Sequence, residues 1–136
     1  MLAARNRLRT ATDFSTTVRS GVRNGRRNVV LYAAAIAADE PSRIGFIVSK
    51  SVGNAVVRNL VKRRLREAAA ASLREHATGL AIVVRALPAS SSASWEQLLA
   101  DYNAALETTQ NRLAGRPPRP AAKGSADTTR EGTTRA

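Results

Sequence analysis

The chain has 136 residues, with 22 lysine and arginine side chains against 10 aspartate and glutamate, and a formal net charge of +12. This length suits a single domain with a modest core, and the charge makes a polyanion the expected partner. Cysteine is absent, which excludes disulfides and thiolate metal sites. No apolar run is long enough to cross a bilayer, so we expect a cytoplasmic protein with no membrane segment.

The positive charge is concentrated in the first half of the chain. Residues 1–66 carry 14 basic and 3 acidic side chains, a net +11, whereas residues 67–136 carry 8 and 7, a net +1. The binding surface is therefore expected mainly in the first half. It begins with a basic arm, RNRLR, whose cations are Arg5, Arg7 and Arg9.

A short helix and a pair of strands are predicted after this arm. Thr12 is a candidate N-cap for a helix that carries Phe14 and Val18 on one face and ends at Gly21. A second basic cluster follows, with Arg23, Arg26 and Arg27, and it contains an Asn-Gly dipeptide that favours a turn. Residues 29–37 and 43–49 are rich in β-branched and apolar side chains and predict two antiparallel strands.

The segment from Lys50 to Glu67, KSVGNAVVRNLVKRRLRE, predicts a helix with one cationic face. Asn54 caps it, and alanines extend it to about Glu75. At about 100° per residue, one arc of roughly 140° collects a set of polar side chains. These are Arg58, Asn59, Lys62, Arg63 and Arg66, with Val57, Val61, Leu65 and Ala68 on the opposite side. Like charges four residues apart are destabilising, which favours a phosphate ligand over a merely solvated face.

The C-terminal half predicts a buried strand and a final amphipathic helix. The strand is residues 79–86, GLAIVVRA, nearly all apolar. Ser94 and Gln97 form a capping box for the helix, whose packing face is Trp95, Leu98, Leu99, Tyr102 and Leu106. From about Gly115 the composition predicts a disordered tail. We therefore expect one α+β domain over residues 1–114, in the order α-β-β-β-α-β-α, and a tail over 115–136.

The sequence shows no grouping of residues that is typical of an enzyme active site. His76, the one histidine, lies at a predicted helix end, where it is typical of a surface or capping residue. Gly53 lacks the companions of a nucleotide-binding loop, and no metal-ligand cluster is visible. Among the aromatic residues, Phe46 and Trp95 are predicted in the core. Phe14 and Tyr32 have two open interpretations, core packing or stacking on an unpaired base.

Several of these segments together resemble the bacterial ribonuclease P protein subunit over roughly residues 1–113. They are RNRLR at 5–9, Asp13-Phe14, VLY at 30–32, GFIVSK at 45–50 and the long Lys50 to Glu67 segment. The resemblance implies a mixed sheet covered by helices, like that of a ribosomal protein, with a left-handed βαβ crossover around the basic helix. It also implies an endoribonuclease that acts as a ribonucleoprotein, in which the RNA subunit with Mg²⁺ removes the 5′ leader of precursor tRNA. The protein, expected at one copy per RNA, would bind that RNA and the leader without a cofactor of its own.

The resemblance also assigns residues. RNA binding falls to Lys50, Arg58, Asn59, Lys62, Arg63, Arg66, Arg5, Arg7 and Arg9, and the leader-binding cleft to Phe14, Val18 and Tyr32. Two positions depart from the family pattern: Leu60 stands where many relatives have a basic residue, and Val18 where an aromatic one is common. Arg64 falls toward the apolar side of the helix and ranks below its neighbours.

Two other classes of function remain open at this stage. A ribosomal protein or RNA chaperone would share the charge and the type of fold. A protein-only nuclease or a regulator of duplex DNA would need an active site or a base-reading surface that the sequence does not display.

Overall fold

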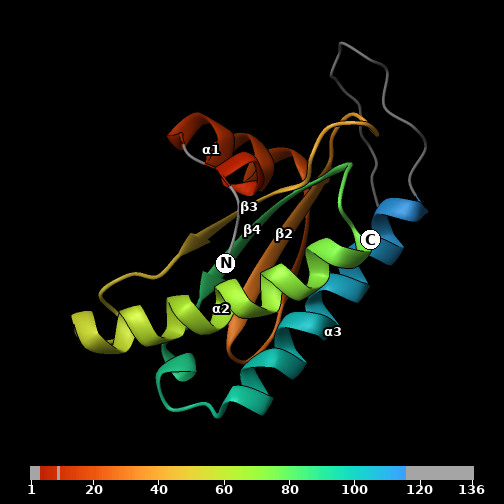
Figure 1. Ribbon diagram of the computed structural model, residues 1–136. Coiled ribbons are helices and arrows are strands. Elements are labelled where there is room, and N and C mark those ends of the chain that lie inside the picture. Colours follow the sequence, from red (N-terminus) through yellow and green to blue (C-terminus); the bar gives the residue numbers. More distant parts are fainter. Residues whose placement is uncertain (1–3, 9, 116–136) are drawn as a thin grey trace.

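The computed structural model describes residues 4–8 and 10–115 of the chain. Its elements, in order, are η1 (Ala4–Asn6), α1 (Ala11–Ser20), β1 (Val22–Gly25), β2 (Val29–Ala35), β3 (Arg43–Ile47), α2 (Ala55–Glu75), β4 (Leu80–Ala86), η2 (Pro88–Ser91) and α3 (Trp95–Ala114) (Figure 1). This confirms the predicted α+β class and the order α-β-β-β-α-β-α. The predicted tail, apart from Gly115, lies outside the described residues. No helix in the described ranges is both long and apolar enough to span a membrane.

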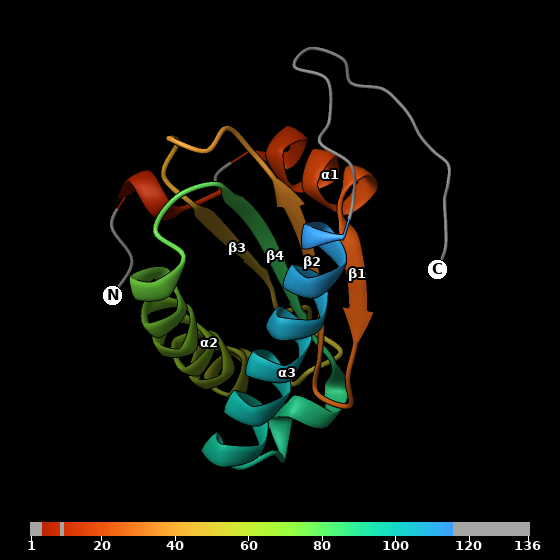
Figure 2. The same ribbon diagram turned by 90° about the vertical axis from the view of Figure 1, so that its right-hand side faces the viewer.

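The four strands form one mixed sheet in the order β1-β2-β4-β3. β4 pairs antiparallel with β2 and parallel with β3, so the strand expected inside the sheet does lie there. The predicted pairing of the second and third strands is wrong in one respect, because β4 lies between them. The connection from β3 through α2 to β4 is left-handed, as the resemblance implied (Figure 2).

Helices cover the two faces of the sheet unequally. The long helices α2 and α3 lie side by side on one face, and the short α1 lies on the other (Figures 1 and 2). Alternation along the strands sends Leu31, Ile44 and Ile82 into the core under α2 and α3. The intervening side chains therefore point to the α1 side. This unequal cover leaves one face of the sheet closed and the other only partly covered.

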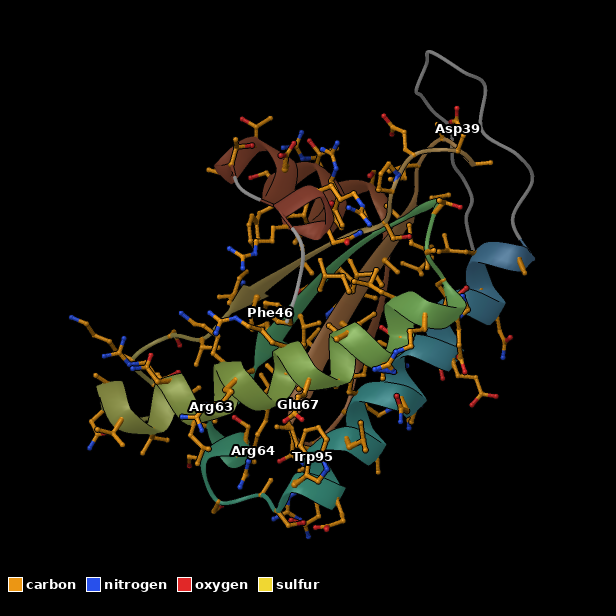
Figure 3. The ribbon with its side chains drawn as sticks, viewed as in Figure 1. Asp39, Phe46, Arg63, Arg64, Glu67 and Trp95 are labelled. Atoms are coloured by element: carbon orange, nitrogen blue, oxygen red, sulfur yellow. The ribbon has the colours of Figure 1, made fainter. Side chains whose placement is uncertain are left out.

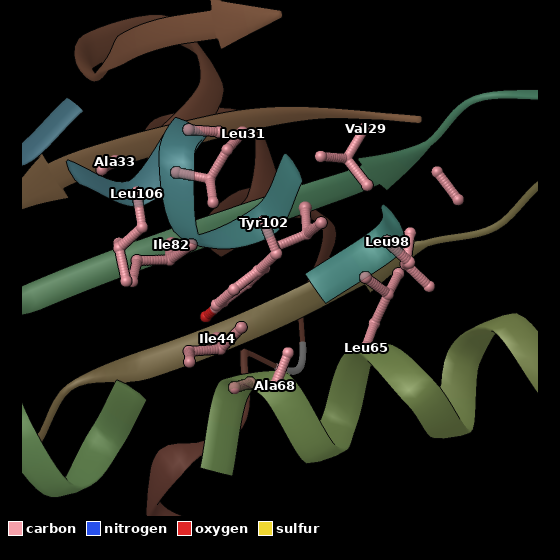
Figure 4. Close-up of a cluster of buried hydrophobic side chains, with 14 of the residues drawn as sticks. Val29, Leu31, Ala33, Ile44, Leu65, Ala68, Ile82, Leu98, Tyr102 and Leu106 are labelled. Carbon is pink, nitrogen blue, oxygen red and sulfur yellow. The ribbon is translucent and has the colours of Figure 1, made fainter. Parts of the chain in front are cut away.

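The main core contains a buried polar link between its two long helices. Tyr102 of α3 is fully buried among Leu31, Leu65 and Ile82 (Figure 4). Its hydroxyl lies 2.8 Å from Ser72 Oγ of α2, and the Ser72 hydroxyl also donates to the Ala69 carbonyl oxygen. This pair satisfies polar atoms that would otherwise be costly to bury, and it helps to set α2 against α3.

Helix capping follows the sequence with one exception. Asn54 Oδ1 accepts from Val57 N, and the Ser94–Gln97 capping box is complete. The predicted cap Thr12 is wrong, because Thr10 Oγ1 accepts from Asp13 N and Thr12 lies in the first turn. Two threonines two residues apart satisfy the same local rule, and only the position of Asp13 at N3 separates them.

The turn between β1 and β2 also differs from the prediction. The Asn-Gly dipeptide at 24–25 lies in β1, and the chain reverses at residues 26–28. Asn28 explains the shift, because its backbone and side-chain nitrogens both donate to Asp101 Oδ2 of α3, at 3.0 and 2.9 Å. This long-range contact holds the turn, and it outweighs the local preference of the dipeptide.

Burial raises the pKa of Tyr102 to about 12, while its hydrogen bond to Ser72 acts in the opposite direction. Because the folded-state pKa lies above the ordinary value of about 10, the folded protein holds this proton more tightly than the unfolded chain. The free energy of unfolding should therefore fall by about 2–3 kcal/mol between pH 10 and 12 on this account. Urea unfolding of the wild type and of Tyr102→Phe should show a smaller alkaline decline in the variant. If the free energy of unfolding declined equally in both proteins, Tyr102 would not be the source of the pH dependence.

Candidate nucleic-acid interface

The rotation of α2 about its axis is fixed by its buried face. Val61, Leu65 and Ala68 are 1%, 0% and 2% exposed, so they anchor the helix against the sheet and α3. The polar arc predicted from the sequence consequently lies along one flank. Its members on that flank are Arg58 and Lys62, which are half-buried, and Asn59, Arg63 and Arg66, which are exposed.

The cations on this flank have no acidic partner within the described part of the chain. Arg58 Nε donates to the Gly53 carbonyl oxygen at 3.1 Å, and no hydrogen bond or ion pair joins Lys62 or Arg66 to a carboxylate. The first turn of α2 has no acidic residue either, so the positive end of the helix dipole adds to the field. The repulsion among these groups is relieved only by water, salt or an anionic ligand.

Arg64 lies on the opposite flank of the same helix. Its Nη1 donates to the Ala93 carbonyl oxygen at 3.1 Å, in the loop that leads into α3. Figure 3 shows Arg64 near Trp95, whereas Phe46 lies on the other side of α2. Its guanidinium is thus bonded to the protein's own backbone, which agrees with the prediction that Arg64 ranks below its neighbours.

A groove of about 210 Å³ lies where α1, β3, α2 and the N-terminal segment meet. Its lining residues are Arg7, Leu8, Phe14, Ile44, Gly45, Phe46, Lys62 and Arg66. The N-terminal segment reaches the groove by pairing with the outer edge of β3, where Leu8 N donates to the Ile44 carbonyl oxygen at 3.2 Å. The groove thus combines one aromatic side chain from α1 with two cations from α2 and one from the N-terminal segment.

Phe14 owes its place in the groove to a glycine. A Cβ atom on Gly45 would come within 2.6 Å of Phe14 Cε2, so the ring lies directly over bare backbone of β3. Gly45 pairs with Val83, and Val83 pairs with Tyr32, so Tyr32 is in the same cross-strand row on the α1 side. Tyr32 is half-buried and is not part of the groove lining. Val18 is also half-buried, one helical turn beyond Phe14.

The other predicted RNA-binding residues lie around these elements. Lys50 is exposed in the turn before α2, Arg5 is exposed in η1, and Arg7 lines the groove. Arg9 lies outside the described residues. Leu60, at the position where many relatives have a basic residue, is 37% exposed on the flank of α2 away from the groove.

Four groove residues were not among the predicted site residues: Leu8, Ile44, Gly45 and Phe46. Phe46 packs against the main core as predicted, but it also lines the groove, because β3 is an edge strand and its side chains reach solvent. Gly45 leaves the space on β3 that the Phe14 ring occupies. A glycine inside an alternating apolar strand signals a close approach of another group, and that signal was present in the sequence.

The residues considered for catalysis or metal binding have other places in the described structure. His76 is the C-cap of α2, and its backbone N–H donates to the Ser72 carbonyl oxygen at 2.9 Å. Within residues 4–8 and 10–115, no three histidine, aspartate or glutamate side chains gather in a way that could hold a metal ion.

These observations define a small α+β protein whose cationic helix borders a groove lined by two phenylalanine side chains, a surface suited to an anionic partner. The ribonuclease P family model matches residues 2–110. The ribonuclease P protein component of Pseudarthrobacter chlorophenolicus is 85% identical over 136 residues, which is 100% of both chains, and that of Kocuria rhizophila is 54% identical over 84% of this chain and 100% of its own. The chain therefore belongs to the ribonuclease P protein family.

Solved structures agree with this assignment. The ribonuclease P protein of Staphylococcus aureus matches with a TM-score of 0.69 at 27% identity, over 76% of this chain and 94% of that one. The protein from Thermotoga maritima matches with a TM-score of 0.61 at 24% identity, over 79% and 97%, and supports the fold.

The contact between Gly45 and Phe14 predicts a sharp difference between two glycine substitutions. Gly45→Ala should lower the free energy of unfolding by about 1–3 kcal/mol, because the new methyl group displaces the ring or the helix that carries it. Gly25→Ala is the matched control, since its added Cβ would meet no atom closer than 3.8 Å. Its effect should stay within about 0.5 kcal/mol. Urea unfolding of both variants measures the two changes in the free energy of unfolding. Equal losses would contradict the close packing of Phe14 on Gly45.

Proposed function

We propose that this chain, as the protein subunit of a ribonuclease P ribonucleoprotein, binds the catalytic RNA and holds the 5′ leader of precursor tRNA. The RNA subunit with Mg²⁺ then cuts the phosphodiester bond, and the product is the mature 5′ end of the tRNA. The observation that carries the proposal is the groove in which Phe14 meets Lys62 and Arg66. One aromatic face beside unpaired cations is the combination that single-stranded RNA requires.

The groove accounts for two kinds of interaction. Lys62 and Arg66 would neutralise backbone phosphates and release counterions, which gives affinity without sequence preference. Phe14 would stack on an unpaired base, which a mature tRNA 5′ end does not offer at this site. The half-buried Arg58 and the exposed Arg63, Arg5 and Lys50 extend the positive field beyond the groove, where the RNA subunit would be held.

Reconstitution tests the proposal. The chain added to its cognate RNA subunit at low Mg²⁺ should stimulate cleavage of precursor tRNA, and the chain alone should not cleave. Lys62→Ala should weaken precursor binding by about three- to tenfold and lower the slope of log K against log salt by about 0.7–0.9. Arg74→Ala removes an equal charge from an exposed site at the end of α2 and is the control. Absence of stimulation by the wild type would favour a ribosomal protein or RNA chaperone instead.

A second measurement isolates the aromatic contribution. Phe14→Leu keeps an apolar side chain over Gly45 but cannot stack on a base, so binding of leader-bearing tRNA should weaken by about 1–3 kcal/mol. Binding of mature tRNA by the same holoenzyme should change little. Fluorescence titrations with the two substrates give the difference directly, and an equal loss on both would rule out leader stacking by Phe14.

A further inference from the structure

A second pocket, of about 240 Å³, lies where the turn between β1 and β2 meets the loop from η2 to α3 and the first turns of α3. These elements meet at the lower end of the molecule in Figure 1, away from α1. The pocket shares no lining residue with the groove beside α2. Its volume is below the range of about 300–1,000 Å³ that suits drug-sized molecules, so it fits a smaller ligand. Three alanines, Ala89, Ala93 and Ala100, form its apolar walls.

Asp101, which lines this pocket, is held in place through one of its two carboxylate oxygens. Its Oδ2 accepts from the backbone nitrogen of Asn28 at 3.0 Å and from the side-chain nitrogen at 2.9 Å, and Asn28 is 4% exposed. Within the described ranges, the other oxygen, Oδ1, has no hydrogen-bond partner. The two bonds from Asn28 fix the plane of the carboxylate, so the fold leaves one acceptor oxygen at a defined position for a ligand.

Two groups that can only donate line the same pocket without pairing with this oxygen. Arg27, from the second basic cluster of the sequence, is exposed, and its guanidinium has no hydrogen bond or ion pair in the part of the chain that the structure describes. Gln97 uses its Oε1 to accept from Ser94 N at 2.9 Å, which leaves its Nε2 as a donor. A carboxylate and a guanidinium that share a pocket and do not meet suit a ligand with donors for one and acceptors for the other.

We propose that this pocket binds one unpaired guanine of an RNA strand. Guanine presents the donors N1–H and N2–H₂ on its Watson–Crick edge, and the acceptors O6 and N7 on the neighbouring edge. Asp101 Oδ1 would accept from N1–H and N2–H₂, while Arg27 would donate to O6 and N7. Adenine and cytosine each offer a carboxylate a single amino group, so they would bind more weakly.

The inference goes beyond the leader groove. In that groove, phosphate contacts and base stacking give affinity with little sequence preference, whereas hydrogen bonds to a base edge read its identity. The net charge of +12 draws RNA to the surface of the protein, and the pocket would then add one base-specific contact. It would be a second RNA contact, at the opposite end of the domain from α1.

The test uses the full-length chain and three neutral nucleosides, guanosine, adenosine and cytidine. They carry no phosphate that the cationic flank of α2 could bind. In nitrogen–proton correlation NMR spectra, guanosine should cause saturable shifts of the Gln97 side-chain amide and of the Asn28 and Ala93 backbone amides. Adenosine and cytidine should bind about five- to a hundredfold more weakly, the discrimination that a good bidentate contact to a base gives.

Asp101→Asn separates base recognition from folding. The new amide oxygen can still accept from Asn28, but the free acceptor becomes an N–H donor, which the donors of guanine cannot meet. Guanosine should therefore bind at least about fivefold more weakly, and Arg27→Gln, at an exposed position, should weaken it in the same direction. Glu107→Gln removes an equal negative charge from an exposed position of α3 and is the matched control, which should bind guanosine like the wild type.

Three outcomes would overturn the inference. Equal binding of the three nucleosides, or no saturable shift with guanosine, would show that the pocket does not read a guanine. An equal loss in Asp101→Asn and Glu107→Gln would show that only the charge of the helix matters. Larger shifts of the same signals with free glycine would assign the pocket to a zwitterion instead. Each result leaves the proposed function intact, because leader binding is measured with precursor tRNA and with variants of the groove.

Discussion

The burial of one face of α2 determines where the positive charge of this protein lies. Val61, Leu65, Ala68 and Ala69 are almost fully buried, and the link from Ser72 to Tyr102 fixes the far end of the helix. The cations on the adjoining flank therefore cannot turn away from one another without breaking the core. Core packing supplies the free energy that holds these like charges together on one flank of the helix.

The topology then places that flank beside an aromatic wall. Because β3 is the edge strand and α2 follows it directly, the left-handed crossover leaves α2 along the rim of the sheet. The N-terminal segment pairs with the free edge of β3 and brings Arg7 and Leu8 to the same rim. This pairing also covers an edge that would otherwise be open to association with other strands. Side chains from α1, α2 and the N-terminal segment thus meet in the groove around the short strand β3.

Much of this arrangement is local and could be predicted from the sequence. The cap at Asn54, the cationic arc and the capping box at Ser94 each depend on residues a few positions apart, and the structure has all three. The place of β4 between β2 and β3 could not be predicted, because it depends on pairings among distant segments. The turn after β1 was misplaced for the same reason, since Asp101, 73 residues away from Asn28, decides it. Roles inherited through the family resemblance, such as those of Val18 and Tyr32, stay predictions.

Gly45 lies where the groove beside α2 meets the α1 side of the sheet. Because it has no side chain, Phe14 can lie on β3, where the ring belongs both to the groove beside α2 and to the row that leads across the sheet to Tyr32. A larger residue would lift α1 from the sheet and separate these two regions.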